Sequence, residues 1–460
     1  MSSPVGPFVR NAKEHPIGVL RAFGLAFLLC LFGLAPGCGD DQEGSKNPSE
    51  ATSAEKPAAT GKPAAAQPQT PDDLPLALVL GLSAFAERDP GDTGLPVPLP
   101  AELEFIARRG GKWVKTTMTD PDSNVFHKAL AYETPDGSMA LLTGAGSKAM
   151  IKLWTKENGQ LVSQTLWEKD FGGRFSRIRD IEVGDIDANG TNVIVAATHD
   201  QGIVAVVRPK DGGYEVEVLD SEKDIFVHEI ELGDMDGDGA IEIYATPSEP
   251  NRLDGSSQSG RVVRYRPNQG EGRVVVADLG ERHAKEILVH DIDGDGKDEL
   301  YVIVEGQKNP QGSGLLHRTE IWRYVADTAP DQGVVVAELD DRLGRFLTPS
   351  DLDGDGQMEI VVALFKKGVW WLRPGPDPTK PWRKKAIDRR SSSFEHAAIA
   401  TDLDGDGVQE LYVASDNDKA LRRYVWNGRR LVKEEIYRRS DNRSILTWNI
   451  MPIPVELVAD

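Results

Sequence analysis

Five acidic loops carry the clearest chemistry in this 460-residue sequence. Their first aspartates are spaced by 49, 57, 60 and 51 residues, and four of the loops have the pattern Asp-x-Asp-Gly-Asp-Gly-x-x-Glu. Calcium takes about six to eight oxygen ligands, and alternate side chains of a tight loop converge on one cation where the backbone turns sharply at a glycine. The absence of His and Cys from the loops favours calcium over zinc. The pattern therefore predicts about four Ca²⁺ sites, with the ligands Asp234, Asp236, Asp238 and Glu242; Asp291, Asp293, Asp295 and Glu299; Asp351, Asp353, Asp355 and Glu359; and Asp402, Asp404, Asp406 and Glu410.

The first acidic loop departs from this pattern. It has Asp185, Asp187 and Asn189, but Val193 replaces the glutamate at the ninth position, so we expect a weak or empty metal site. For all the loops, the alternative is a set of Asp/Gly turns capped by their own side chains without metal. That alternative leaves sixteen carboxylates, four in each complete loop, to repel one another.

The loops mark a longer repeat that predicts the fold. Each loop lies between two short strand patterns, and two further strand patterns follow before the next copy. Four antiparallel strands in about fifty residues are typical of one β-propeller blade. Residues 127–168 repeat the blade without its acids, which gives six blades. Residues 103–118 and 444–457 each match half of another blade, so we predict an all-β, seven-bladed β-propeller whose last blade is split between the two ends of the chain. An open six-bladed ring is the alternative.

The repeated loops, with Phe171-Gly172-Gly173 upstream of one of them, resemble the FG-GAP or VCBS repeats of extracellular β-propellers. That group includes the ligand-binding head of integrin α chains. The resemblance covers residues 103–460. It implies a calcium loop with side-chain ligands at positions one, three, five and nine and a backbone carbonyl ligand at position seven.

A second periodic feature is a ring of basic residues. Six positions before each loop stands Arg179, His228, Lys285, Arg345 or His396, and His127 is the counterpart in the loop-less blade. At about 3.3 Å per residue, these residues lie roughly 20 Å from the acidic loops, at the mouth of the central channel. They are candidates for binding an anionic or sugar-like ligand. Alternatively, each pairs with a neighbouring acid such as Asp180, Glu229 or Glu286.

Aromatic residues offer a further candidate ligand surface. Six tryptophans of the repeats could line a carbohydrate-binding face, although blade aromatics more often serve packing. They are Trp322, Trp370, Trp371, Trp382, Trp426 and Trp448.

Two functional hypotheses remain open. No His-Glu-x-x-His motif or phosphate-binding loop occurs, so no catalytic residue is assigned. The first hypothesis is a calcium-binding adhesion, binding or scaffold module with a protein or carbohydrate ligand. The second is a lyase or hydrolase that acts on a carbohydrate or small anionic substrate with the channel-mouth His, Lys and Arg residues. A net charge of −20, from 53 basic and 73 acidic residues, argues against nucleic acid as a partner.

The N-terminal segment predicts export. Arg10, Lys13 and Arg21 precede an apolar run that ends at Leu34, as in a signal peptide. Leu34-Ala35-Pro36-Gly37-Cys38 resembles the bacterial lipoprotein cleavage box, which implies lipidation of Cys38; an ordinary secretory signal is the alternative. We therefore expect a signal peptide at 1–37, a disordered Pro/Ala/Ser-rich tether at 38–75, a linker at 76–102 and the propeller at 103–460. The expected location is the extracytoplasmic side of a bacterial envelope, with the lipid anchor in the outer membrane as the only membrane contact.

Overall fold

The structure is a computed structural model that describes residues 70–87, 96–173, 175–250, 252, 256–391 and 397–459. The predicted signal peptide, Cys38 and most of the predicted tether lie outside these residues, and so does His396. Within the described ranges, no helix has the length and apolar character needed to cross a membrane.

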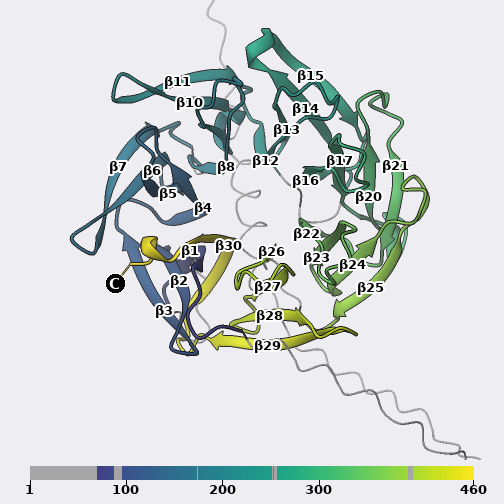
Figure 1. Cartoon of the computed structure of the whole chain (residues 1–460). Coiled ribbons are helices and arrows are strands. Elements are labelled where there is room, and N and C mark those ends of the chain that lie inside the picture. The colour runs from purple at the N-terminus through teal and green to yellow at the C-terminus, as the bar shows by residue number, and fades with distance from the viewer. Residues whose placement is uncertain are drawn as a thin grey trace, which may run out of the picture. The chain divides into compact units, whose positions relative to one another are not determined.

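Seven four-stranded antiparallel sheets form a propeller ring, which confirms the predicted fold (Figure 1). In six blades, the strands follow one another outward from the central channel. Three of them are β4 (Val125–Glu133), β5 (Met139–Gly146), β6 (Ala149–Glu157) and β7 (Gln160–Lys169); β8 (Ile178–Gly184), β9 (Val193–Thr198), β10 (Val204–Lys210) and β11 (Gly213–Asp220); and β12 (Phe226–Gly233), β13 (Glu242–Ser248), β14 (Arg261–Arg266) and β15 (Glu271–Asp278).

The next three blades repeat this order. They are β16 (Ala284–His290), β17 (Glu299–Val304), β20 (Thr319–Tyr324) and β21 (Val334–Leu339); β22 (Gly344–Ser350), β23 (Glu359–Leu364), β24 (Gly368–Arg373) and β25 (Arg383–Asp388); and β26 (Ala398–Thr401), β27 (Glu410–Ser415), β28 (Ala420–Trp426) and β29 (Leu431–Arg438). A small hairpin of β18 (Gln307–Lys308) and β19 (Leu315–His317) interrupts the first of these. Three 3₁₀ turns are η1 (Asp200–Gly202), η2 (Pro267–Gln269) and η3 (Val455–Leu457).

The seventh blade joins the two ends of the chain, as predicted, but its division differs from the prediction. Three strands come from the N-terminal side, namely β1 (Leu76–Phe85), β2 (Ala101–Arg109) and β3 (Lys112–Asp120), and one comes from the C-terminal side, β30 (Ser444–Pro454). The predicted linker at 76–102 thus contains β1, which pairs with both β2 and β30. Because β1 is buried along almost its whole length, its sequence is apolar apart from Ser83 and lacks the alternation that marks a half-exposed strand.

The last residues of the predicted tether also contact the propeller. The amide of Gly111 donates to the carbonyl of Asp72 over 2.9 Å, and the amide of Gly110 donates to Asp73 Oδ1 over 2.7 Å. Leu74 is buried. The propeller therefore includes residues before β1, and the predicted boundary at residue 103 is too late.

The hydrophobic core lies between neighbouring blades. The second strands β9, β17, β23 and β27 are buried at every residue, and they consist mainly of β-branched and other apolar residues. Large side chains fill the spaces between sheets, among them Tyr244, Tyr301 and Tyr412, which have no exposed surface. This rigid packing holds the loops at the two ends of each sheet in place.

Candidate functional site

The acidic loops connect the first and second strands of five blades. In each of the four complete loops, carboxylate oxygens of the aspartates at positions one, three and five lie within 4.8 Å of one another, and Glu299 joins the group in its loop. The sixth-position glycines Gly239, Gly296, Gly356 and Gly407 have φ between +83° and +89°. Glycine adopts this left-handed conformation without steric cost, so the loop can turn and bring its acids together.

The first aspartate of each loop holds the backbone in this turn. In the loop that begins at Asp291, its Oδ1 accepts hydrogen bonds from the amides of Gly294 and Asp295 at 2.7 and 3.1 Å, and its Oδ2 accepts one from Gly296 at 3.0 Å. The incomplete loop has the same kind of bonds, because Asp185 accepts from Asn189 and Gly190. These bonds therefore occur with and without a complete ligand set.

The ninth-position glutamate lies at the base of the loop. Glu299 is buried, and its Oε2 accepts hydrogen bonds from the amide of Ile292 and the hydroxyl of Tyr301 at 3.1 and 2.9 Å. Burial raises the pKa of Glu299 and of Glu359 to about 7. For Glu410, burial and the charge of Asp404 raise the pKa to about 8. An additional cation would favour the charged form of each glutamate.

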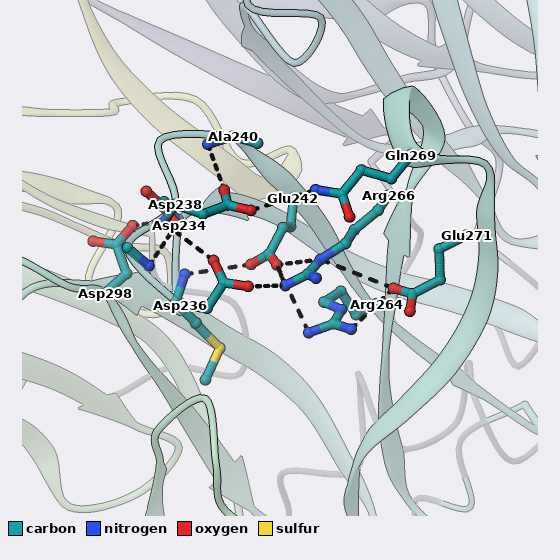
Figure 2. Close-up of polar contacts among 12 residues, drawn as sticks. Asp234, Asp236, Asp238, Ala240, Glu242, Arg264, Arg266, Gln269, Glu271 and Asp298 are labelled. Carbon is teal, nitrogen blue, oxygen red and sulfur yellow. Dashed lines mark hydrogen bonds and ion pairs between the residues drawn. The ribbon is translucent and has the colours of Figure 1, made fainter.

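An arginine from the third strand of the blade contacts most of these loops, and our sequence analysis missed it. Arg323 Nη2 lies 2.6 Å from Asp293 Oδ2 and 3.1 Å from Glu299 Oε1. Arg266 bridges Asp236 and Glu242 in the same way, as Figure 2 shows, and Arg373 bridges Asp353 and Glu359. The available signal was an Arg followed by Pro or Tyr near the end of each third strand: Arg208, Arg266, Arg323, Arg373 and Arg423.

The residues of the complete loops fit a hard divalent cation. Each loop has four carboxylates, and where an arginine bridges two of them it balances only one negative charge. In three loops, an oxygen of the third-position aspartate is buried and has no hydrogen-bond partner: Asp293 Oδ1, Asp353 Oδ1 and Asp404 Oδ1. A buried acceptor without a partner costs free energy, and a bound cation would satisfy it.

The incomplete loop differs in a way that agrees with the prediction of weak binding. Arg208 contacts both oxygens of Asp187, with Nε 2.9 Å from Oδ2 and Nη2 3.2 Å from Oδ1. Asp185, Asp187 and Asn189 therefore offer fewer free oxygens than a complete loop. Their weak affinity for metal stays a prediction.

The described residues of the basic ring lie at the ends of the innermost strands opposite to the acidic loops, as predicted. His127, Arg179, His228 and Arg345 are at most 5 % exposed. A β-bulge occurs in each of these strands and in β16 at or beside the basic residue. A bulge adds one unpaired residue and redirects the side chains around it, so the simple alternation used in the sequence analysis does not hold there. Nothing of the Lys285 side chain is described, although the residue lies in β16.

The residues of the basic ring differ in their partners, because one pairs with an acid and another contacts a histidine. Arg345 forms an ion pair with Glu286, with 2.8 Å between Nε and Oε1, as the structural interpretation anticipates. Asp180 instead pairs with Lys128 at 3.0 Å and accepts a hydrogen bond from the amide of Ile230. Arg179 Nη1 lies 3.3 Å from His127 Nδ1. The structural interpretation therefore fits Arg345, while a ligand-binding role for the other ring residues stays a prediction.

Two further histidines extend the ring into a cluster that the periodicity did not reveal. The His199 ring lies 5.8 Å from the ring of His127 and 5.1 Å from that of His228, and the His283 ring lies 5.8 Å from that of His228. His199 follows β9 and His283 precedes β16, so both are at the channel-mouth end of their sheets. Their positions just outside the strands, at the same end as the basic ring, are the sequence feature from which this cluster could have been predicted.

Burial decides the charge of this cluster. Burial first, and then the charges of Arg177 and Arg179, lower the pKa of His127 and His199 well below the ordinary value. These two histidines are thus neutral near pH 7, beside the positively charged Arg177 and Arg179. The enzyme hypothesis requires His228, His396 and either His127 or Lys285 to converge on one substrate atom. The described residues do not test this, because His396 lies outside them.

The fold and the loops together define a seven-bladed β-propeller with acidic loops that could bind metal ions. Residues 351–413 match the model of the FG-GAP-like repeat family, so the chain carries an FG-GAP-like repeat, in agreement with the resemblance seen in the sequence.

Comparison with solved structures supports the fold alone. The chain is similar to an Agrocybe aegerita protein whose structure is described as the basis of specific recognition of non-reducing terminal N-acetylglucosamine, with 14 % identity, a TM-score of 0.50, and coverage of 79 % of this chain and 90 % of that one. A weaker similarity, with 11 % identity, a TM-score of 0.37 and coverage of 57 % and 81 %, relates it to the major Malassezia sympodialis allergen Mala s 1. No match was found among curated proteins.

Proposed function

We propose that this chain is a calcium-stabilised β-propeller that serves as a binding module outside the cytoplasm. The observation that carries the metal assignment is the set of buried third-position oxygens, Asp293 Oδ1, Asp353 Oδ1 and Asp404 Oδ1, which have no hydrogen-bond partner. Oxygen-only ligands in a glycine-turned loop are suited to calcium. The metal would tie the first strand of a blade to the second and balance the remaining acids.

The same assignment gives calcium a stabilising role. A ligand that binds only the native state stabilises it by about 2.7 kcal/mol per site at a hundredfold excess over Kd. Each of the four loops joins the two inner strands of its blade. Calcium bound in all four would therefore raise the free energy of unfolding at several places around the ring. The bound calcium would then make the propeller a rigid support for ligand-binding loops at the opposite end of the sheets.

Direct metal measurement tests the proposal. We expect the purified protein, dialysed against calcium and then against metal-free buffer, to retain up to about four Ca²⁺ per chain by elemental analysis. Titration of the chelator-treated protein should show calcium binding, with magnesium weaker because it demands a smaller octahedral site. Asp353→Asn should remove one site, whereas Asp187→Asn, in the incomplete loop, should leave the count unchanged. A protein that binds no calcium in this titration would overturn the proposal.

The proposed location rests on the N-terminal sequence. We propose that the signal peptide directs export, that Cys38 is lipidated, and that the anchor holds the propeller at the outer membrane, where it meets a protein or carbohydrate ligand. Expression in a bacterial host with radiolabelled palmitate tests this: the wild type should incorporate label and partition with membranes. Cys38→Ser should do neither, and equal labelling of both proteins would contradict lipidation at this residue.

A further inference from the structure

A small cavity lies between the outer strands of two neighbouring blades, away from the acidic loops and at the same end of the sheets as the basic ring. Its volume is about 210 Å³, and residues from the outer strands β21, β24 and β25 and from their connections line it. The β23–β24 turn and the β21–β22 connection contribute to its wall, so it lies at the end of the sheets opposite to the acidic loops. Sites for drug-sized ligands have volumes of about 300–1,000 Å³, so this cavity suits a smaller molecule.

The cavity is positively charged in a strongly acidic protein. Four basic and two acidic side chains line it, which gives a formal charge of +2, whereas the whole chain has −20. Both acids are already paired: Arg318 lies 2.8 Å from Glu338 Oε1 and 3.2 Å from Asp340 Oδ1. The excess positive charge therefore comes from Lys367, Lys384 and Arg389. Among the residues that the structure describes, only Lys367 of these three approaches an acid, Asp340, at 3.9 Å.

Arg389 is the best placed of these groups to bind an anion. Its guanidinium lies 4.7 Å over the ring of Trp370, and no carboxylate pairs with it among the residues that the structure describes. Trp370 Nε1 donates to the carbonyl of Lys367 over 2.9 Å, which holds the indole in place. A guanidinium held against an aromatic face keeps its hydrogen-bond donors available for a carboxylate or a phosphate group.

The backbone around the cavity is shaped for this arrangement. Gly368 has φ of +77°, and a Cβ atom there would lie 1.9 Å from the carbonyl oxygen of Asp388 and 2.9 Å from the Cα of Arg389. Only glycine permits this close approach. Lys384 Nζ donates to the carbonyl of Glu338 over 2.5 Å and has further donors left.

From these features we infer that the cavity binds a hexose-sized ligand with an oxyanion group, either a carboxylate or a phosphate ester. Arg389 binds the oxyanion, Lys367 and Lys384 add positive charge, and Trp370 contacts the body of the ligand. This inference rests on the proposed binding function and names the ligand class and its site. The shared chemistry is a small anion attached to a ring.

Titration calorimetry of the calcium-loaded full chain at low salt tests the inference with four probes: glucuronate, glucose 6-phosphate, glucose and inorganic phosphate. We expect at least one charged hexose to bind about tenfold or more tightly than glucose and than inorganic phosphate, and to bind less tightly as salt rises. The tighter of the two charged hexoses identifies the oxyanion. Equal binding of glucose, equal binding of inorganic phosphate, or no binding of either charged hexose would overturn the inference.

A matched pair of variants locates the site. Arg389→Gln should weaken binding of the charged hexose by about tenfold to a hundredfold, because it removes a charge-assisted hydrogen-bond donor. Arg390→Gln removes the same charge at the next residue, which is exposed like Arg389 but does not line the cavity, and it should leave binding unchanged. Equal losses in the two variants would mean that net charge alone is responsible and would contradict the site.

Melting curves in calcium and in EDTA distinguish a failure of this inference from a failure of the proposed calcium binding. Arg389→Gln should keep the calcium response of the wild type, because Arg389 lies far along the sheet from the β22–β23 loop. If calcium stabilises the protein but neither charged hexose binds, this inference fails while the calcium assignment stands. If calcium has no effect, the assignment fails, whatever the hexoses do.

Discussion

Arg423 donates its Nε hydrogen to Glu434 Oε2 over 2.6 Å and has no ion pair with the acidic loop of its own blade among the described residues. The corresponding Arg323 bridges two acids of its loop, Asp293 and Glu299. The loop that begins at Asp402 therefore balances its acids without a bridging guanidinium. Loops with nearly the same sequence thus differ in how much they need an added cation.

This difference predicts opposite effects of one substitution in two loops. In EDTA, Glu299→Gln should destabilise the protein by about 1–3 kcal/mol, because it leaves Arg323 without one of its buried partners. Glu410→Gln should be neutral or stabilising in EDTA, because burial and the charge of Asp404 raise the pKa of Glu410 to about 8, so the metal-free glutamate is already mostly uncharged and Gln keeps a neutral group there. Urea unfolding of the two variants checks this, and equal destabilisation would contradict the role given to Arg423.

Chelation should destabilise the whole propeller. We expect EDTA to lower the melting temperature by many degrees, since the native state alone holds the metal and several sites act together. Asp293→Ala should reproduce part of this loss, and Asp187→Ala should cost clearly less. Differential scanning calorimetry with and without calcium provides the measurement, and an unchanged melting curve in EDTA would argue against structural calcium.

Closure of the ring predicts the effect of truncating either end. Deletion of residues 444–460 removes β30, leaves the edge of β1 unpaired and should cause aggregation or loss of cooperative unfolding. Deletion of residues 39–69, which the composition predicts to be a tether, should leave the melting curve unchanged. Size-exclusion chromatography and thermal melts distinguish the two, and equal tolerance of both deletions would refute closure by β30.

Arg345 and Glu286 predict a structural contribution from one member of the basic ring. Both side chains are buried, so Arg345→Gln removes the cation that lies 2.8 Å from the Glu286 carboxylate and should destabilise the protein by about 3–5 kcal/mol. The double variant Arg345→Met and Glu286→Leu should recover much of this loss, because it removes both charges of the pair together. Chemical unfolding measures both, and a single variant as stable as the wild type would mean that Arg345 is held for a ligand instead.

The neutral histidines predict a loss of stability in acid. The folded-state pKa of His127 and of His199 lies well below the unfolded value of about 6.5, so the unfolded chain takes up protons first as the pH falls. Above about pH 6.5 these residues cause no pH dependence, and below it each lowers stability by up to about 1.4 kcal/mol per pH unit. Unfolding at saturating calcium from pH 5 to 8 should show this slope in the wild type.

A double variant isolates the histidine contribution. His127→Gln with His199→Gln has no imidazole at either position, so its stability should depend less on pH between 5 and 6.5 than that of the wild type. His290→Gln replaces a histidine of β16 that lies next to an acidic loop and outside the cluster, and it should keep the wild-type slope. Identical slopes in the double variant and the wild type would show that the buried histidines are protonated without cost.

Strand content, blade number and the acidic loops followed from the sequence because each depends on local pattern. The recurring Asp and Gly positions specify a loop whose own backbone amides bind Asp291 or its counterparts, so no distant residue is needed to form it. The periodic return of that loop specifies the repeat. The match of residues 351–413 to FG-GAP-like repeats rests on the same local pattern.

The features that only the tertiary structure reveals depend on contacts between residues far apart in the sequence. The apolar run of β1 is a strand only because β30, more than 350 residues later, pairs with it and both its faces are buried. Bulges redirect His127 and Arg179, and burial among arginines makes His127 neutral, which its sequence position cannot reveal. The arginines that bridge the acidic loops and the cavity at Arg389 likewise form only when separate strands are brought side by side, because side-chain charge and cavity shape are properties of the packed ring.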